Sequence, residues 1–89
     1  MIFSYITTGT TTQVWTGASK KVHISVNTAL TGTITVVDAA TGGTGTIAVI
    51  TNPTVGLQLE YWGLLNGVQI VTSTSCDITV SVDFSRPGT

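Results

Sequence analysis

The alternation of apolar and polar residues constrains the fold of this chain more than any other feature of its sequence. In the segment Lys21–Val26 every second residue is apolar, and the same spacing runs through residues 33–36, 55–61 and 78–84. Successive side chains of a β-strand point to opposite faces, so a period of two predicts strands with one buried face each. Helical spacing does not occur with any consistency, and we therefore expect an all-β protein.

Threonine fills many of the polar positions in these segments. It suits them because its β-branched side chain favours the pleated backbone while its hydroxyl can still bind water. Weaker strand signals lie at residues 2–8, 13–15, 46–51 and 68–72. Together these segments predict seven to eight short antiparallel strands, which form a β-sandwich or a jelly-roll-like barrel. A jelly roll fits a chain of this size best.

Glycine, asparagine and proline mark the turns between the predicted strands. Asn66-Gly67 is the strongest signal for a two-residue type I′ turn, in which both residues have positive φ, so we expect a tight hairpin there. Thr41–Gly45 reads as a glycine-rich turn between strands. Asn52-Pro53 should end the preceding strand, because proline cannot donate a hydrogen bond to a neighbouring strand, and Pro87-Gly88 should close the fold.

The 89 residues leave room for a single β-sandwich domain over residues 1–89. The one cysteine, Cys76, cannot form an intrachain disulfide, and no cluster of His and Cys suggests a structural metal. Oligomerisation is then the remaining way to stabilise so small a fold. Residues 1–13 fit either a core strand or an extended arm that pairs with a neighbouring subunit.

Charged residues are scarce. Three Lys or Arg and four Asp or Glu make up 8% of the chain, against about 25% in typical soluble domains, so much of the surface is expected to be covered by neighbours. A net charge of −1 offers no attraction for nucleic acid or an anionic membrane. The N-terminus lacks the basic start of a signal peptide, and the longest apolar run, Ile47–Ile50, is too short to span a bilayer.

No sequence pattern predicts catalysis. His23, Cys76 and Asp77 are residue types that can serve as base, nucleophile and orienting group, but Cys76 and Asp77 are consecutive and would point to opposite faces of a strand. The carboxylates are scattered one per segment, and Gly42–Gly45 lacks the lysine and the following helix of a phosphate-binding loop. We expect no enzyme, no cofactor and no metal site.

Aromatic residues are better candidates for a binding role. Trp15, Tyr61 and Trp62 suit either a sugar-stacking surface or core packing, since an aromatic ring offers a large apolar body and, in Tyr and Trp, a polar group. Consecutive Tyr61 and Trp62 must face opposite sides of a strand. We expect Trp62 to be the outward one, covered by a loop or by another subunit.

Three stretches carry a resemblance to a known class of proteins: residues 26–36 (VNTALTGTITV), 66–73 (NGVQIVTS) and 77–80 (DITV). In these stretches and their spacing, residues 21–83 resemble small β-rich structural proteins of tailed bacteriophages, some of which are capsid decoration or cement proteins. The chain departs from that pattern at Leu64-Leu65, where an aromatic residue often precedes Asn-Gly.

The resemblance implies a virion protein on the capsid surface, made in the host cytoplasm. Its partners would be the major capsid protein and copies of itself, in a homo-oligomer for which the resemblance favours a trimer, with no nucleic acid or membrane bound. We expect Phe3, Tyr5, Trp15 and Trp62 to form the partner interface.

Two alternatives stay open: a head-to-tail or tail-surface module, and a non-viral carbohydrate-binding or adhesin-like sandwich. A sugar binder should expose coplanar aromatics beside a polar groove. A cement protein should expose a flat, apolar and threonine-rich face.

Overall fold

The computed structural model describes residues 2–40, 43 and 45–84, which form eight β-strands and no helix. Every segment that the sequence predicts as a strand contains one, although the strand predicted over residues 55–61 begins only at Gln58. The strands are β1 (Ile2–Ile6), β2 (Thr11–Thr16), β3 (Lys21–Val26), β4 (Thr33–Val37), β5 (Thr46–Thr51), β6 (Gln58–Trp62), β7 (Gly67–Thr72) and β8 (Ile78–Asp83).

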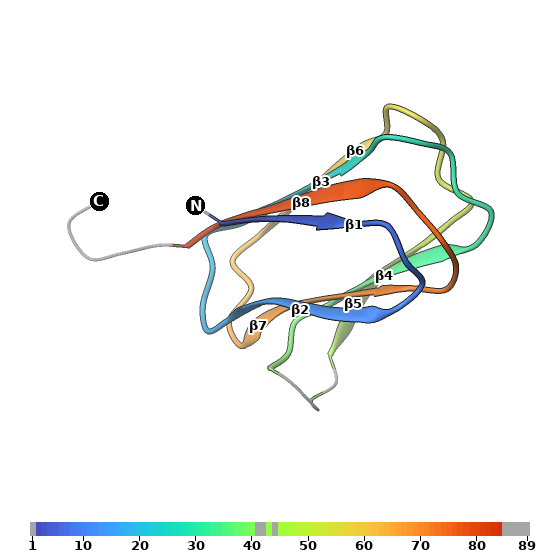
Figure 1. The fold of residues 1–89 in the computed structure, drawn as a ribbon. Coiled ribbons are helices and arrows are strands. Elements are labelled where there is room, and N and C mark those ends of the chain that lie inside the picture. Colours follow the sequence, from blue (N-terminus) through green and yellow to red (C-terminus); the bar gives the residue numbers. More distant parts are fainter. Residues whose placement is uncertain (1, 41–42, 44, 85–89) are drawn as a thin grey trace.

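The strands form two four-stranded antiparallel sheets that pack face to face as a sandwich (Figure 1). We call β1-β8-β3-β6 the first sheet and β2-β7-β4-β5 the second sheet. The first strand pairs with the last, the second with the seventh, the third with the sixth and the fourth with the fifth. This is a long hairpin rolled up on itself, which is the topology of a jelly roll. The predicted fold class is therefore confirmed.

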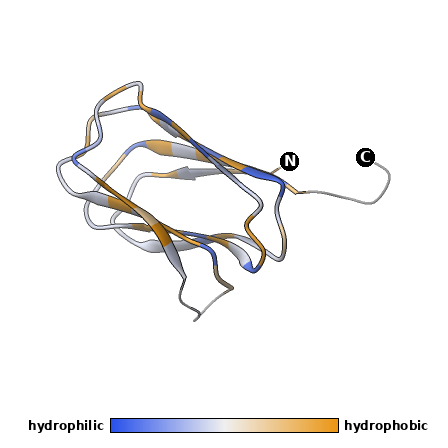
Figure 2. Ribbon diagram, turned by 180° about the vertical axis from the view of Figure 1, so that it is seen from behind, coloured by the Kyte–Doolittle hydropathy of each residue, from blue (hydrophilic) through white to orange (hydrophobic). Residues whose placement is uncertain are grey.

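The core consists of the alternate, inward-facing residues of both sheets. Val22, Ile24 and Val26 of β3 are buried, as are Ile34 and Val36 of β4. Figure 2 shows apolar segments in both layers, as expected when each sheet contributes one dry face. The largest fully buried side chains are Ile24, Ile34, Ile70, Ile78, Val22, Val26, Val36, Val68, Val80 and Val82.

The predicted hairpin at Asn66-Gly67 is wrong. β6 ends at Trp62 in the first sheet and β7 begins at Gly67 in the second, so the connection crosses between the sheets. Neither residue has positive φ. Gly67 is instead a point of close backbone approach, because a Cβ there would lie 2.5 Å from the carbonyl oxygen of Ala39 and 2.9 Å from that of Trp15.

The Asp38 carboxylate holds this crossing in place. It accepts hydrogen bonds from the backbone N–H groups of Leu65 (3.1 Å), Asn66 (2.8 Å) and Gly67 (3.3 Å). Partial desolvation raises the pKa of Asp38, but the hydrogen bonds from Asn66, Leu65 and Gly67 outweigh it and hold the pKa below the ordinary value of 3.8. A side chain from the end of β4 thus fixes the start of β7.

Several other turn predictions can be compared with the structure. β5 ends at Thr51, directly before Asn52-Pro53, as predicted. The segment Thr41–Gly45 connects the paired strands β4 and β5, although residues 41, 42 and 44 lie outside the described residues. Pro87-Gly88 also lies outside them. The alternation over residues 55–61 predicts that Val55 lies on the buried face of a strand. In the structure Val55 precedes β6 and is 66% exposed.

The N-terminal segment lies within the molecule's own first sheet. Residues 2–6 form β1 at the edge of that sheet, where β1 pairs with β8 from Ile2↔Val82 to Ile6↔Ile78. Ile6 is buried in the core, whereas Phe3 and Tyr5 point outward.

Candidate functional site

The outer face of the first sheet gathers polar and aromatic side chains from all four of its strands. The register aligns Phe3 of β1 with Ser81, Ser81 with His23, and His23 with Glu60 of β6. In the neighbouring row Lys21 lies between Asp83 of β8 and Trp62 of β6. These residues are separated by up to 80 positions in the sequence, from Phe3 to Asp83, so only the strand order of the jelly roll brings them together.

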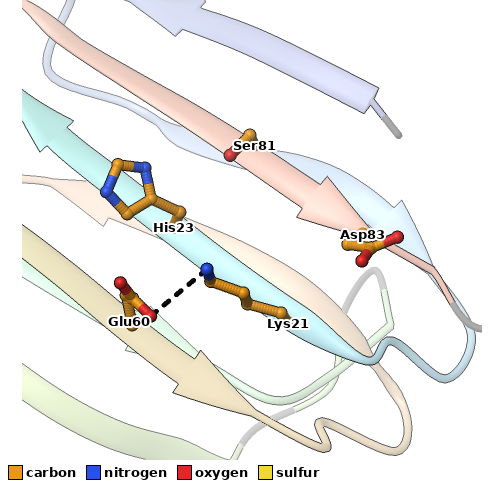
Figure 3. Close-up of a pocket in the computed structure, with 5 residues that line it drawn as sticks. All are labelled: Lys21, His23, Glu60, Ser81 and Asp83. Atoms are coloured by element: carbon orange, nitrogen blue, oxygen red, sulfur yellow. Dashed lines mark ion pairs between the residues drawn. The ribbon is translucent and has the colours of Figure 1, made fainter.

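The middle of this face is a shallow pocket of about 260 Å³ lined by Lys21, His23, Glu60, Ser81 and Asp83 (Figure 3). The Nζ of Lys21 lies 3.3 Å from Oε2 of Glu60 and 5.2 Å from the centroid of the Trp62 ring. Both partners of the ion pair are partly exposed, so solvent screens most of its contribution to stability. The pocket therefore presents donors and acceptors to solvent on an open sheet surface.

Three of the four aromatic residues predicted at the interface lie on this face. Phe3 and Tyr5, on the edge strand β1, are 68% and 64% exposed, and Trp62, on the opposite edge strand β6, is 64% exposed. The outward direction of Trp62 is confirmed, and Tyr61 packs against the core instead. A hydrogen bond to Asp77, slight desolvation and the charge of Asp77 raise the pKa of Tyr5 above 10.0.

Trp15 does not join that group. It lies on β2 in the second sheet and stacks on Phe84, with ring centroids 4.5 Å apart and an interplanar angle of 12°. Its indole N–H donates a hydrogen bond of 3.0 Å to the carbonyl oxygen of Ala18. Both the apolar ring and the polar group of Trp15 therefore have partners within the molecule.

The second sheet has a very different outer face. Its four strands contain no Asp, Glu, Lys, Arg or His, whereas the first sheet carries Lys21, Glu60 and Asp83. One row across the second sheet reads Thr11, Val71, Thr35 and Val49, followed by a pair of threonines, Thr33 and Thr51.

Two amides on the second sheet are satisfied by neighbours in the same sheet and the adjoining turn. Gln69 donates to the side-chain oxygen of Gln13 at 3.1 Å. Gln13 in turn donates to the backbone carbonyls of Trp15 and Ala39, each at 2.8 Å. The result is an uncharged face of threonine, valine and satisfied amides.

The structure does not bring together the residues considered for chemistry. His23 lies in the pocket of the first sheet, whereas Cys76 and Asp77 line a second pocket with Thr28, Ala29 and Ser75. Burial and the charge of Asp77 raise the pKa of the Cys76 thiol, although a hydrogen bond with Thr72 works in the opposite direction. The Cys76 Sγ lies 3.4 Å from the carbonyl oxygen of Ile6, a contact in which the thiol is the donor.

The structure also places side by side a set of residues that sequence reasoning missed. Ser81, His23 and Glu60 are direct neighbours across three strands and are the residue types of a nucleophile, base and carboxylate. In the described part of the chain no hydrogen bond joins them, and Glu60 is paired with Lys21. Only the register between β8, β3 and β6 could have revealed this row.

Three further findings bear on the functional class. Among the described residues, no group of three or more His, Cys, Asp or Glu side chains is placed to hold a metal ion. The same residues contain no helix long and apolar enough to cross a membrane. Comparison with models of protein families, with curated proteins and with solved structures finds no match for this chain.

Proposed function

We propose that this chain is a structural protein of a bacteriophage virion, a decoration or cement protein that binds the outside of the capsid and stabilises it. The observation that carries the proposal is the uncharged outer face of the second sheet, where threonine and valine follow one another across four strands. An uncharged face of this kind can be covered by a protein shell without the burial of a charge.

The energetics of covering that face support the proposal. Burying a charge without a partner is costly, whereas threonine and valine bury methyl groups and leave at most a hydroxyl to be satisfied. Val49 is 57% exposed and Ile47 is 45% exposed on the edge strand β5. A shell surface could therefore cover the second sheet without removing any charged group of that sheet from water.

The aromatic residues of the first sheet supply a second contact surface. Exposed aromatic side chains are frequent among the residues that dominate binding energy at interfaces. Phe3, Tyr5 and Trp62 lie on the face opposite to that of the second sheet. A protein that clamps neighbouring subunits needs two contact surfaces, and this sandwich has one on each face.

The remaining parts of the proposal follow the resemblance described above. The partners are the major capsid protein and further copies of this chain, with a trimer as the assembly that the resemblance implies. The chain is made in the host cytoplasm and functions on the capsid surface. No catalytic group, cofactor or nucleic acid takes part in this role.

The test is co-sedimentation of the purified protein with shells assembled without it. We expect saturable binding on the order of hundreds of copies per shell, as the repeated sites of a symmetric capsid require. Copy numbers of about a dozen would instead place the chain at the neck or tail. Absence of binding to every part of the particle would overturn the proposal.

Matched variants identify the surfaces that contact the shell. Val49→Asp and Trp62→Asp each place a charge on one of the two faces, and Val55→Asp makes the same kind of change at an exposed loop residue. We expect the first two to weaken binding at least about tenfold, or 1.4 kcal/mol, and Val55→Asp to leave it unchanged. Replacing Lys20 and Lys21 by Ala should weaken binding less than Trp62→Asp, because charge pairs contribute little to such a contact.

A second candidate function rests on the pocket of the first sheet. Its polar lining lies between Phe3 at one edge and Trp62 at the other, which are potential stacking surfaces for a sugar ring. A carbohydrate-binding role predicts that some glycans shift the fluorescence of Trp62 and that Trp62→Ala abolishes the response. A glycan screen without any such shift would exclude this alternative.

A further inference from the structure

The four edge strands of the sandwich differ in how they discourage pairing with another chain. Edge strands expose unpaired backbone N–H and C=O groups, and natural proteins protect them with charges, prolines, bulges or short length. β6 carries Glu60 at its centre, and the pairing of β2 with β7 shifts register between Gln13 and Trp15. The edge strand β5, Thr46-Ile47-Ala48-Val49-Ile50-Thr51, contains neither a charge nor a proline, and the register shift in its pairing with β4 is confined to its first half, at Ile47.

β5 also offers apolar side chains to an approaching strand. It pairs with β4 on one side, and no described backbone group bonds to its other side. Residues Ala48–Thr51 are in regular register with β4, from Val36↔Ala48 to Thr33↔Thr51. Val49 is the most exposed of the apolar residues on this strand. The second half of β5 is therefore an uncharged edge in regular register, without a proline or a bulge.

We propose that β5 pairs antiparallel with β5 of a second copy of this chain, joining the two second sheets into one continuous sheet. The partner follows from the symmetry of the contact. In a two-fold pairing each side chain lies opposite the same residue of the partner or a near neighbour of that residue. Any charged residue would therefore lie close to a residue of the same charge across the interface. β6 is excluded by Glu60, whereas β5 has no charge to repel its own copy. β1 is also uncharged, but it borders the sheet that carries Lys21, Glu60 and Asp83, and the variants below distinguish the two edges.

The pleat limits the register of this contact. Opposite residues of an antiparallel pair lie on the same face, so outward-facing residues must pair with outward-facing residues. A two-fold axis at Val49 meets this condition, with Val49 opposite the partner's Val49 and Thr51 opposite the partner's Ile47. The central pairs of this contact, Val49 with Val49 and Ala48 with Ile50, lie in the regular half of the strand. Only Ile47 lies at the register shift between Val36 and Val37.

The proposed contact extends the uncharged face described above. The row Thr11, Val71, Thr35 and Val49 of one copy would continue into the same row of the other. The pairing needs no shell and stands independently of the proposed virion role. It also differs from the trimer that the resemblance implies, because an isologous contact of this kind closes as a dimer.

The test is sedimentation velocity of the purified chain over concentrations from about 1 µM to about 1 mM, the range in which a small interface associates. We expect reversible formation of a dimer. Val49→Lys should shift the midpoint of association at least about tenfold upward. Val55→Lys, the same change at an exposed loop residue, and Phe3→Lys, on the other uncharged edge strand β1, should leave it unchanged.

Hydrogen exchange identifies the strand directly. In the wild type, amides of β5 should exchange more slowly at high than at low concentration, while those of β1 should not change. The proposal is overturned if the chain stays monomeric throughout this range or forms only trimers. It is equally overturned if Phe3→Lys dissociates the dimer and Val49→Lys does not.

Discussion

Replacing Gly67 tests whether this position requires a special backbone conformation or free space. Gly67 lacks positive φ, but a Cβ would lie 2.5 Å from the carbonyl oxygen of Ala39 and 2.9 Å from that of Trp15. Both oxygens belong to backbone that cannot rotate away, so adding even one methyl group must push two strands and a turn apart. Inserting extra atoms into a packed site costs about 1–3 kcal/mol.

We therefore expect Gly67→Ala to destabilise the protein by about 1–3 kcal/mol, with Asn and Val each costing more because they add further atoms. At roughly 4–8 °C per kcal/mol for a domain of this size, the Ala variant should melt about 10 °C below the wild type. Thermal unfolding followed by circular dichroism measures the shift.

Gly56 provides the matched control. It has φ of +84° and nothing within 4 Å of the position of a Cβ, so only its conformation penalises a side chain. Because Asn tolerates positive φ better than Ala, Gly56→Asn should be more stable than Gly56→Ala. At Gly67 the order should be reversed. If Asn is better tolerated than Ala at Gly67 as well, the close approach is wrong and a left-handed turn there is correct.

Two further predictions concern titrating groups. Since hydrogen bonds hold the pKa of Asp38 below 3.8, its contribution to the free energy of unfolding is present above that pH and lost as the pH falls through the lower folded value. Urea titrations should thus show that Asp38→Asn lowers the free energy of unfolding at about pH 7 and lowers it less at about pH 2.5. An equal decrease at both pH values would contradict the role of the ionised Asp38 carboxylate as hydrogen-bond acceptor. Burial raises the pKa of Cys76 above 9.0. Its thiol should therefore react with a disulfide reagent more slowly near neutral pH than a cysteine in an unstructured peptide. An equal rate would count against the packing of Cys76 beside Ile6.

The local pattern of the sequence was sufficient to find the strands. In β3 and β8 every second residue is fully or nearly fully buried, so the alternation of Val22, Ile24 and Val26 reports the core directly. The position of Trp62 on the outer face follows from the same period. These features depend only on neighbours along the chain, and that is why the sequence could predict them.

The failures all depend on contacts between distant segments. Asn66-Gly67 has the composition of a tight turn, but the carboxylate of Asp38 and the backbone of Ala39, which lie in the turn after β4, decide its conformation. The stacking of Trp15 on Phe84 likewise could not be predicted, because the two residues lie far apart in the chain.

The segregation of charge between the two sheets was hidden for the same reason. The sequence did not reveal which strands share a sheet, so it could not show that Lys21, Glu60 and Asp83 all belong to the first one. The row of Ser81, His23 and Glu60 also required the strand order and register.

The most direct test of the proposed role is heat-induced DNA release from particles that lack this protein, measured before and after the purified protein is added. A protein that binds only the intact shell stabilises it by about 2.7 kcal/mol per site at a hundredfold excess over Kd, and many sites add their effects. We predict that the release temperature rises with added protein and then saturates, with little change between low and moderate salt. An unchanged release temperature at a concentration that saturates the shells would contradict the cementing role.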